Sequence, residues 1–321
     1  MLAMSDLLLV LALALTLEVA FGDPVTRWHP VAVFGAFINR LMAFAPAEGS
    51  ARQVAFGAAV VALGVGLIAA GSATALQWIG AASGWAAMVL GGVLLKVSLS
   101  YRQLEGEALG VADLIEATKL TEARRALRAL VARQTEGLAP SLAASAAVES
   151  LAENLNDSFV APLFYCVLLG VPGALAYRAL NTLDAMIGYH GRFEYLGRTA
   201  AKMDDVASYI PARLTAVLIM LAAGLAGSDA RGAASGALRD HGRTASPNAG
   251  WPMGAMAGAV RARIEKVGHY RLGVADGDCT PLTIRDAVRV ARWGAALAAG
   301  FAIAAALGAS GSANLLSRLL P

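Results

Sequence analysis

An acidic stripe lies in the middle of the chain, in the stretch ESLAENLNDSFVAPLFY that begins at Glu149. Glu149, Glu153 and Asp157 recur every four residues, which places their carboxylates on one face of a helix. The residues that follow are apolar, so the acids are costly unless a cation compensates them. Carboxylates and an amide such as Asn154 are ligands that Mg²⁺ prefers, together with substrate phosphates. The stripe therefore predicts either a Mg²⁺–phosphate site or a solvated helix face paired with arginines.

A second polar group follows in the stretch YRALNTLD. Arg178, Asn181 and Asp184 fall on adjacent turns of a helix. One interpretation is a helix cap, because Asn, Thr and Asp favour caps. A polar helix face directly beside an apolar segment fits a substrate-binding surface better, so we expect these three side chains to contact a ligand.

A third group is the stretch KMDDVASYIPAR, which carries Lys202, Asp204, Asp205 and Arg213. Adjacent acids point in different directions on a helix, so Asp204 and Asp205 are not expected to share one role. We expect one to hold a metal, with Asp205 as the candidate, while the other pairs with Lys202 or Arg213. The alternative is that both acids open a helix and complement its dipole.

Two Pro-punctuated stretches, SPNAGWP and GDPVTRWHP, have the local signals of loops. Ser246 and Asn248 in the first are suited to bind an anion or an amide, and Trp251 to stack on a flat ligand. Arg27 and His29 in the second are able to face a phosphate or a carboxylate. In both cases the alternative is an ordinary turn.

Several other kinds of chemistry lack a sequence signal. The four histidines are far apart and have no HxxxH or HxH partner, which argues against a transition-metal site. The chain has no GxxxxGK[ST] phosphate loop and no GxSxG nucleophile motif. The net charge of +3 contains no basic run of the nucleic-acid type. Two isolated cysteines fit a cytosol-facing protein without disulfides.

The composition predicts an integral membrane protein. The 321 residues are 57% hydrophobic and only 15% charged, with a mean hydropathy of +0.59, whereas soluble domains are about a quarter charged. We expect an all-α, polytopic helical bundle with about five to six membrane segments, one of them re-entrant or broken. The candidate windows are Leu7–Phe21, Val54–Leu76, Gly80–Leu99, Phe159–Tyr177, Ala212–Ala226 and Ala287–Ala309.

The broken segment is expected at Phe159–Tyr177, because Pro162 and the Val-Pro-Gly at 171–173 interrupt it. The second and third windows are expected to form a helical hairpin with its link near Gln77–Ile79. The first window is read as a retained helix and not a signal peptide. We expect a single domain over residues 1–321, with amphipathic helices in four polar segments that line one site. These segments are 22–53, 101–158, 178–211 and 229–286.

Several of these motifs, in order, resemble the CbiB/CobD family of membrane-bound adenosylcobinamide-phosphate synthases. The resemblance rests on GDPVTRWHPV, AVESLAENLNDSFVAPLFY, YRALNTLDAMIGY, DDVASYIPARLTA and SPNAGWP, and it covers most of the chain. It implies a ligase that joins the carboxylate of adenosylcobyric acid to the amine of aminopropanol phosphate or threonine phosphate. It implies ATP as co-substrate, Mg²⁺, and a multi-pass place in the bacterial inner membrane, with the site on the cytosolic side.

Such a reaction needs charge neutralisation and alignment around the transferred phosphoryl group. We expect Mg²⁺ ligands among the acids, phosphate clamps among the cations, and a base that is a carboxylate or His29. The predicted catalytic residues are Glu149, Glu153, Asp184 and His29. The predicted metal ligands are Glu149, Glu153, Asp157, Asp184 and Asp205. The predicted phosphate or co-substrate contacts are Arg27, Asn154, Arg178, Asn181, Lys202, Arg213, Ser246 and Asn248.

Two other functional classes compete with the ligase. An ion-coupled or corrinoid transporter would explain a broken helix and the intramembrane Glu18 and Lys96, although no inverted repeat is visible. A non-catalytic membrane scaffold for other cobalamin-pathway enzymes would need none of the acids. Corrinoid uptake by vesicles without amide formation would indicate the transporter. Pathway flux that survives substitution of the acids would indicate the scaffold.

Overall fold

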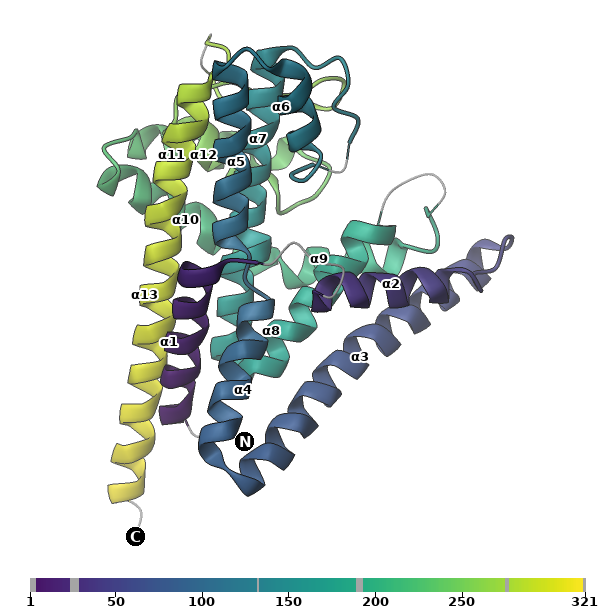
Figure 1. Ribbon diagram of the computed structural model, residues 1–321, viewed down its shortest axis with the longest axis vertical. Helices are drawn as coiled ribbons and strands as arrows, with labels where there is room; N and C mark the ends of the chain where they lie inside the picture. Colours follow the sequence, from purple (N-terminus) through teal and green to yellow (C-terminus); the bar gives the residue numbers. More distant parts are fainter. Residues whose placement is uncertain (1–3, 24–28, 132, 189–192, 275–276, 320–321) are drawn as a thin grey trace. The chain divides into compact units, whose positions relative to one another are not determined.

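The computed structural model resolves two compact units, and each is described by itself (Figure 1). The first unit comprises Met1–Ser100, Ala161–Ala207 and Ala299–Pro321, and the second comprises Tyr101–Val160 and Ser208–Ala298. The structure describes residues 4–23, 29–131, 133–188, 193–274 and 277–319.

All the regular elements in the described part of the first unit are helices. Its helices α2, α3, α8 and α9 share a core of buried aliphatic side chains, among them Ile38, Val61 and Leu183, while α1 packs against α4. Each helix turns its apolar side chains toward this core. Burial of each large apolar side chain contributes about 1.5–3 kcal/mol, so these helix faces pack together. The helices are α1 (Met4–Phe21), α2 (Pro30–Met42), α3 (Ser50–Ala82), α4 (Gly84–Val97), α8 (Ala161–Ile187), α9 (Arg198–Ala207) and the end of α13 (Pro281–Leu319).

The predicted hairpin of apolar helices is present, but its link lies elsewhere. α3 continues through Gln77–Ile79 to Ala82, and only Ser83 separates it from α4. Ser83 adopts an extended conformation, and its hydroxyl accepts a hydrogen bond from the Ala86 N–H at 3.3 Å. Serine is a favoured N-cap residue, so the helix boundary follows the capping signal.

The predicted break in the central apolar segment is confirmed, at a different residue. Gly170 interrupts α8 with φ +72° and ψ −172°, a conformation that only glycine adopts without strain. Pro162 continues the helix, and Pro172 lies just after the break. The chain bends at Gly170 because the backbone of this glycine permits it. Pro172 has no N–H and so cannot donate an intrahelical hydrogen bond just after the bend.

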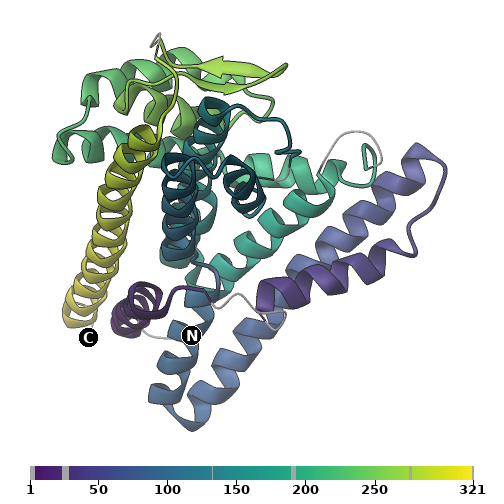
Figure 2. The ribbon, with the colours of Figure 1, turned by 45° about the horizontal axis from the view of Figure 1, so that its top comes forward.

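The second unit is built from helices and one short hairpin. α5 lies beside α6 and α7, and α10, α11 and α12 pack on one another; Figure 2 shows the hairpin beside the green helices, at the top of the view. The strands pair antiparallel in the register Ile264↔Leu272, so this hairpin is an exception to the all-α prediction. The elements are α5 (Tyr101–Glu116), α6 (Leu120–Leu127), α7 (Pro140–Leu155), η1 (Asn156–Val160), α10 (Tyr209–Leu225), α11 (Ala230–Asp240), η2 (His241–Arg243), α12 (Gly250–Ala259), β1 (Ile264–Lys266), β2 (Tyr270–Leu272) and the first part of α13.

Helix α5 is amphipathic, as expected for the polar segment it opens. Its buried residues are Leu104, Ala108, Val111 and Ala112, a spacing that forms one helical face. On its polar side, Glu105 accepts hydrogen bonds from Arg292 of α13 at 2.6 and 3.0 Å. The helix is therefore held by packing on one side and by an ion pair on the other.

Helices α11 and α12 approach closely through small residues. A Cβ on Gly236 would collide with the Gly254 carbonyl, and a Cβ on Gly254 would be 2.7 Å from the Gly236 carbonyl oxygen. Asp240, at the end of α11, is fully buried, and its carboxylate accepts hydrogen bonds from the Arg239 guanidinium at 2.6 and 2.9 Å. It also accepts the Gly273 N–H at 2.8 Å, which ties the hairpin to α11.

The SPNAGWP stretch is a loop only in its first half. Gly250, Trp251 and Pro252 form the first turn of α12. A proline is tolerated there because the first N–H groups of a helix have no intrahelical partner. The prediction of a loop over the whole stretch is therefore wrong for these three residues.

Among the described residues, four helices are long and apolar enough to cross a membrane, or five if the bent pair α9 and α10 forms one broken span. This agrees with the lower part of the predicted range. The N-terminal window is helical, as α1, but is not among the long apolar helices of the described residues. The four are Ser50–Ala82, Gly84–Glu116, Pro140–Ile187 and Pro281–Gly308.

Candidate functional site

The acidic stripe begins with a buried carboxylate. Glu149 on α7 is only 5% exposed, and its Oε2 accepts a hydrogen bond from Arg133 Nη2 at 3.0 Å. Arg133 comes from the segment between α6 and α7. The Nε of Arg133 is buried and has no hydrogen-bond partner in the described part of the chain. A guanidinium with an unused buried N–H can donate a hydrogen bond to a further anionic oxygen.

Tyr270 on β2 completes this cluster. Its hydroxyl donates a weak hydrogen bond to Met253 Sδ at 3.9 Å, and the Glu149 carboxylate lies close enough to oppose its ionisation. Burial raises the pKa of Tyr270 most, the charges of Glu149 and Glu153 raise it further, and Arg133 opposes the shift. Tyr270 therefore stays protonated and acts as a donor. Ser145 of α7 also bonds the hairpin, accepting the Glu265 N–H at 2.7 Å, so the hairpin is fixed against this helix.

The outer part of the stripe is more accessible. Glu153, Asn154 and Asp157 are each half-buried, and the amide of Asn154 donates to the Ser150 carbonyl at 3.0 Å. Regular helical spacing holds for Glu149 and Glu153 but ends at Leu155, where a π-helical turn begins. The argument from i+4 spacing therefore does not extend to Asp157. Its carboxylate accepts a hydrogen bond from the Asn156 amide at 2.7 Å.

The π-helical turn is anchored from α10. Thr215 is fully buried, and its hydroxyl donates to Asn156 Oδ1 at 3.0 Å and to the Pro211 carbonyl at 2.9 Å. Such turns inside α-helices are frequent at functional sites. Here the turn fixes the side chain that bonds Asp157, so Asp157 is held by a network within the second unit.

Arg213 organises a separate polar and aromatic group in the second unit. Its Nη1 donates to Asn248 Oδ1 at 3.3 Å, and its guanidinium lies over the Tyr209 ring at 3.4 Å and the Trp251 ring at 5.0 Å. His241 stacks on Trp251 with centroids 4.3 Å apart. The indole N–H of Trp251 is buried and has no hydrogen-bond partner in the described residues.

The first half of the SPNAGWP loop is closed by internal bonds. Asn248 is 4% exposed, and its backbone N–H donates to the Ser246 hydroxyl at 3.2 Å. Thr244 donates to the Ser246 carbonyl at 2.7 Å. Ser246 and Asn248 thus shape the loop, and Arg213 and Trp251 are the members of this group with donors available to a ligand.

In the first unit, the YRALNTLD and KMDD groups meet through Asn181 and Asp204. Asn181 accepts a hydrogen bond from Arg178 Nη1 and donates one to Asp204 Oδ1, both at 3.5 Å. Asp204 is 9% exposed, whereas Lys202 is exposed. The carboxylate that faces Asn181 is therefore Asp204. Its position could have been found from the i+3 and i+4 spacing of buried residues in α9, which includes Ala200 and Asp204.

Asp184 and Asp205 are half-buried members of the same unit. Within the described residues, no group of three or more His, Cys, Asp or Glu side chains is arranged to hold a metal ion. The donor types still suit Mg²⁺, which usually takes one or two protein carboxylates and completes its shell with waters and substrate phosphates. The predicted metal set remains a prediction, and Arg27 lies outside the described residues.

His29 belongs to a buried ionic cluster in the first unit. Lys96 Nζ lies 2.7 Å from Glu18 Oε2 and also pairs with Asp23, and Ser100 donates to Asp23 at 2.5 Å. His29 Nε2 lies 3.5 Å from Asp23 Oδ1. Sequence reasoning found no partner for Glu18 or Lys96, because the residues that pair are up to 78 positions apart in the chain.

The ring of His29 is engaged at both nitrogens. Nδ1 accepts the Val31 N–H at 3.3 Å and caps α2, which leaves the proton of the neutral ring on Nε2, facing Asp23. A general base needs a free nitrogen lone pair directed at the substrate. This geometry favours a positioning role for His29 over the predicted role as base.

A helical chain with four to five apolar helices of membrane-spanning length, and with buried charged clusters on them, is a polytopic membrane protein. It belongs to the family described as CobD/Cbib protein, whose pattern matches residues 11–293. No solved structure matches the chain.

Named relatives support this membership. The chain is 40% identical over 268 residues to "Cobalamin biosynthesis protein CobD" of Dehalococcoides mccartyi, covering 84% of this chain and 87% of the relative. It is 38% identical to "Probable cobalamin biosynthesis protein CobD" of Methanothermobacter thermautotrophicus, covering 82% and 86%. It is also 40% identical to "Cobalamin biosynthesis protein CobD" of Geobacter metallireducens, covering 79% of this chain and 80% of the relative. The predicted family is confirmed, and with it a place in cobalamin biosynthesis.

Proposed function

We propose that this protein is the amide ligase of its family. It joins the carboxylate of adenosylcobyric acid to the amine of aminopropanol phosphate or threonine phosphate, with ATP as co-substrate and Mg²⁺. The observation that carries the proposal is the polar face of α7, where a buried Glu149 is paired with Arg133 beside the half-buried Glu153.

The reaction has two steps. The carboxylate attacks the terminal phosphate of ATP, which gives an acyl phosphate and ADP, or the α-phosphate, which gives an acyl adenylate and pyrophosphate. The amine then attacks the acyl carbon, the amide C–N bond forms, and phosphate or AMP leaves with one oxygen of the original carboxylate. Bound Mg²⁺ would neutralise charge on the nucleotide phosphates.

The residues present fit these tasks by type. Glu153 and Asp157 in the second unit, and Asp184 and Asp205 in the first, are hard oxygen donors of the type that Mg²⁺ binds. Arg133 and Arg213 keep donors available for phosphate oxygens, as Arg178 and Lys202 are expected to. With His29 engaged at both nitrogens, a carboxylate such as Glu153 is the better candidate to take the proton from the attacking ammonium.

The long apolar helices support a place in the membrane. The protein is expected in the bacterial inner membrane, with its site on the cytosolic side where ATP is available. The corrinoid is large and amphipathic, and the aromatic Trp251 offers an N–H that has no partner in the described residues. Contact with other cobalamin-pathway enzymes is expected because the substrate and product pass between them.

The test is a ligation assay on the purified protein in nanodiscs. Glu153→Ala and Asp184→Ala should each lower kcat at least 100-fold, because the loss of a ligand for a transition-state charge costs about 3–4 kcal/mol. The control is Glu48→Ala, which removes an exposed acid of the first unit. Wild-type turnover in both acidic variants would overturn the assignment of the metal site.

A further inference from the structure

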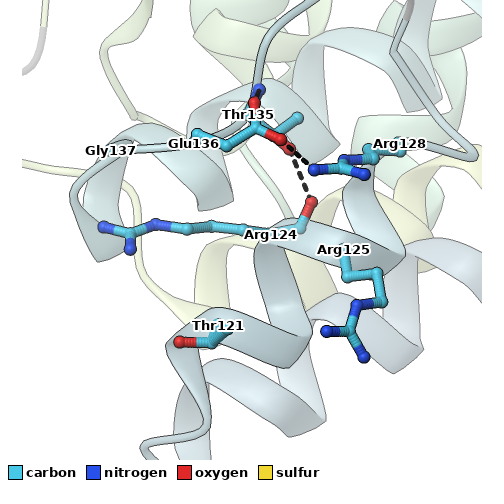
Figure 3. Close-up of a pocket in the computed structure, with 7 residues that line it drawn as sticks. All are labelled: Thr121, Arg124, Arg125, Arg128, Thr135, Glu136 and Gly137. Carbon is cyan, nitrogen blue, oxygen red and sulfur yellow. Dashed lines mark hydrogen bonds and ion pairs between the residues drawn. The ribbon is translucent and has the colours of Figure 1, made fainter.

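A basic pocket lies in the second unit, between α6 and the segment that follows it (Figure 3). Its volume is about 170 Å³. Three arginines and a single carboxylate contribute the charged groups, so the pocket has an excess of positive charge. The lining residues are Thr121, Arg124, Arg125, Arg128, Thr135, Glu136 and Gly137, and we call this the arginine pocket.

One wall of the arginine pocket is rigid. Arg124 donates from Nε and Nη2 to the Leu138 carbonyl at 2.9 and 2.6 Å. The Thr135 hydroxyl donates to the Arg124 carbonyl at 2.7 Å, and Thr135 is only 1% exposed. These bonds fix the segment after α6 against the helix, so the pocket is present before any ligand arrives.

Glu136 occupies the position of an anion in this pocket. Its Oε1 pairs with Arg128 Nη2, and its Oε2 accepts the Thr135 N–H at 3.2 Å. A guanidinium together with a backbone N–H is the donor set that proteins use for phosphate. Both ionic partners are about three-fifths exposed, 59% and 61%, and such surface pairs contribute at most about 1 kcal/mol. A stronger anion can therefore displace Glu136.

Arg125 supplies a further cation to the arginine pocket. It is exposed, and no hydrogen bond or ion pair is recorded for its side chain in the described residues. Figure 3 shows Arg128 directed toward Glu136 while Arg124 and Arg125 leave the helix in other directions. The three guanidinium groups point in different directions and do not meet at one point, which suits a ligand with several anionic oxygens.

We propose that the arginine pocket binds a phosphate group, with Arg125 and Arg128 as ligands and Glu136 displaced from Arg128. Two sources present this chemistry, a soluble phosphate compound and the headgroup of an anionic phospholipid. The proposal does not rest on the ligase assignment, because no residue of the arginine pocket belongs to the proposed catalytic or metal set.

The first arm of the test uses inorganic pyrophosphate and the full chain in detergent, followed by titration calorimetry. Arg125→Gln and Arg128→Gln should each weaken binding at least tenfold. Glu136→Gln should tighten it several-fold, because the competing carboxylate loses its charge. Arg231→Gln, an exposed arginine of α11 outside the pocket, should leave binding unchanged.

The second arm measures phosphatidylglycerol retained by the same variants after purification from mixed vesicles that also contain phosphatidylcholine, by native mass spectrometry. Pyrophosphate binding with the stated order of variants supports a soluble ligand, and selective phosphatidylglycerol retention with that order supports a lipid headgroup. The proposal is overturned if neither pyrophosphate nor phosphatidylglycerol binds. It is also overturned if Arg125→Gln and Arg128→Gln leave the binding unchanged. Unchanged labelling of the buried Cys279 shows that each variant is folded.

Discussion

Replacing Lys96 with methionine should destabilise the first unit strongly. The Lys96 ammonium lies between the carboxylates of Glu18 and Asp23, and the three side chains are 12%, 2% and 6% exposed. Methionine fills a similar volume but carries no charge, so both carboxylates would stay buried without their shared cation. Breaking a buried pair in this way costs about 3–5 kcal/mol, because the remaining charge is uncompensated.

The two buried cysteines provide the assay. Cys166 lies in the first unit and Cys279 in the second, and both are free and buried, so a Cys279→Ser background reports opening of the first unit alone. When opening is fast compared with labelling, the rate follows the population of the open state. A loss of 3–5 kcal/mol should speed maleimide labelling of Cys166 roughly 150- to 5,000-fold.

The matched control is Lys202→Met, which removes an exposed lysine from the same unit. It should change stability by no more than about 0.5 kcal/mol. The triple variant Lys96→Met, Glu18→Gln, Asp23→Asn should recover part of the loss, because no buried charge remains unpaired. Labelling of Cys166 in Lys96→Met within threefold of the Lys202→Met rate would refute the reasoning.

Three further predictions concern packing and protonation. Gly57→Ala should destabilise the first unit by about 1–3 kcal/mol, because the new Cβ would collide with the Leu196 carbonyl oxygen. Gly66→Ala on the same helix should not, because no atom lies within 4 Å of the position of its Cβ. Thermal unfolding of the two variants distinguishes them. Burial raises the pKa of Asp240, but hydrogen bonds and charges, chiefly from the Arg239 guanidinium, lower it overall. The ionised Asp240 therefore stabilises the fold above about pH 3.9, and this stabilisation is lost as the pH falls through the pKa of Asp240 in the folded protein. The stability of Asp240→Asn, measured by chemical unfolding from pH 6 to pH 3, should lack this dependence. Burial raises the pKa of the Cys279 thiol to about 12, so native-state labelling at pH 8 should be far slower than that of an exposed cysteine.

Much of the architecture could be predicted from hydrophobic pattern. The apolar windows and the buried face of α5 follow from helical periodicity, and the break in the central segment follows from its Pro and Gly residues. The break lies at Gly170 because only a glycine adopts that backbone conformation without strain. The hairpin at Ile264–Leu272 could not be predicted, since its three-residue strands are stabilised by contacts with α7.

The site was predicted less completely, for a physical reason. Local spacing identifies side chains on one helix face, but not the distant residues that neutralise them. Arg133 and Tyr270 meet Glu149 from other elements. Asp205 is the predicted metal ligand, but adjacent acids look alike in sequence, and of the two only Asp204 is buried. The π-helical turn after Leu155 also breaks the spacing on which Asp157 was assigned.

The most direct test of the proposed ligase follows the oxygen atoms of the corrinoid carboxylate. Adenosylcobyric acid labelled with ¹⁸O in that carboxylate would be incubated with the protein in nanodiscs, ATP, Mg²⁺ and aminopropanol phosphate or threonine phosphate. We expect an amide product that requires ATP, and one ¹⁸O atom per turnover in phosphate or in AMP. Absence of product with both amines, or product without ¹⁸O in either released species, would contradict the account.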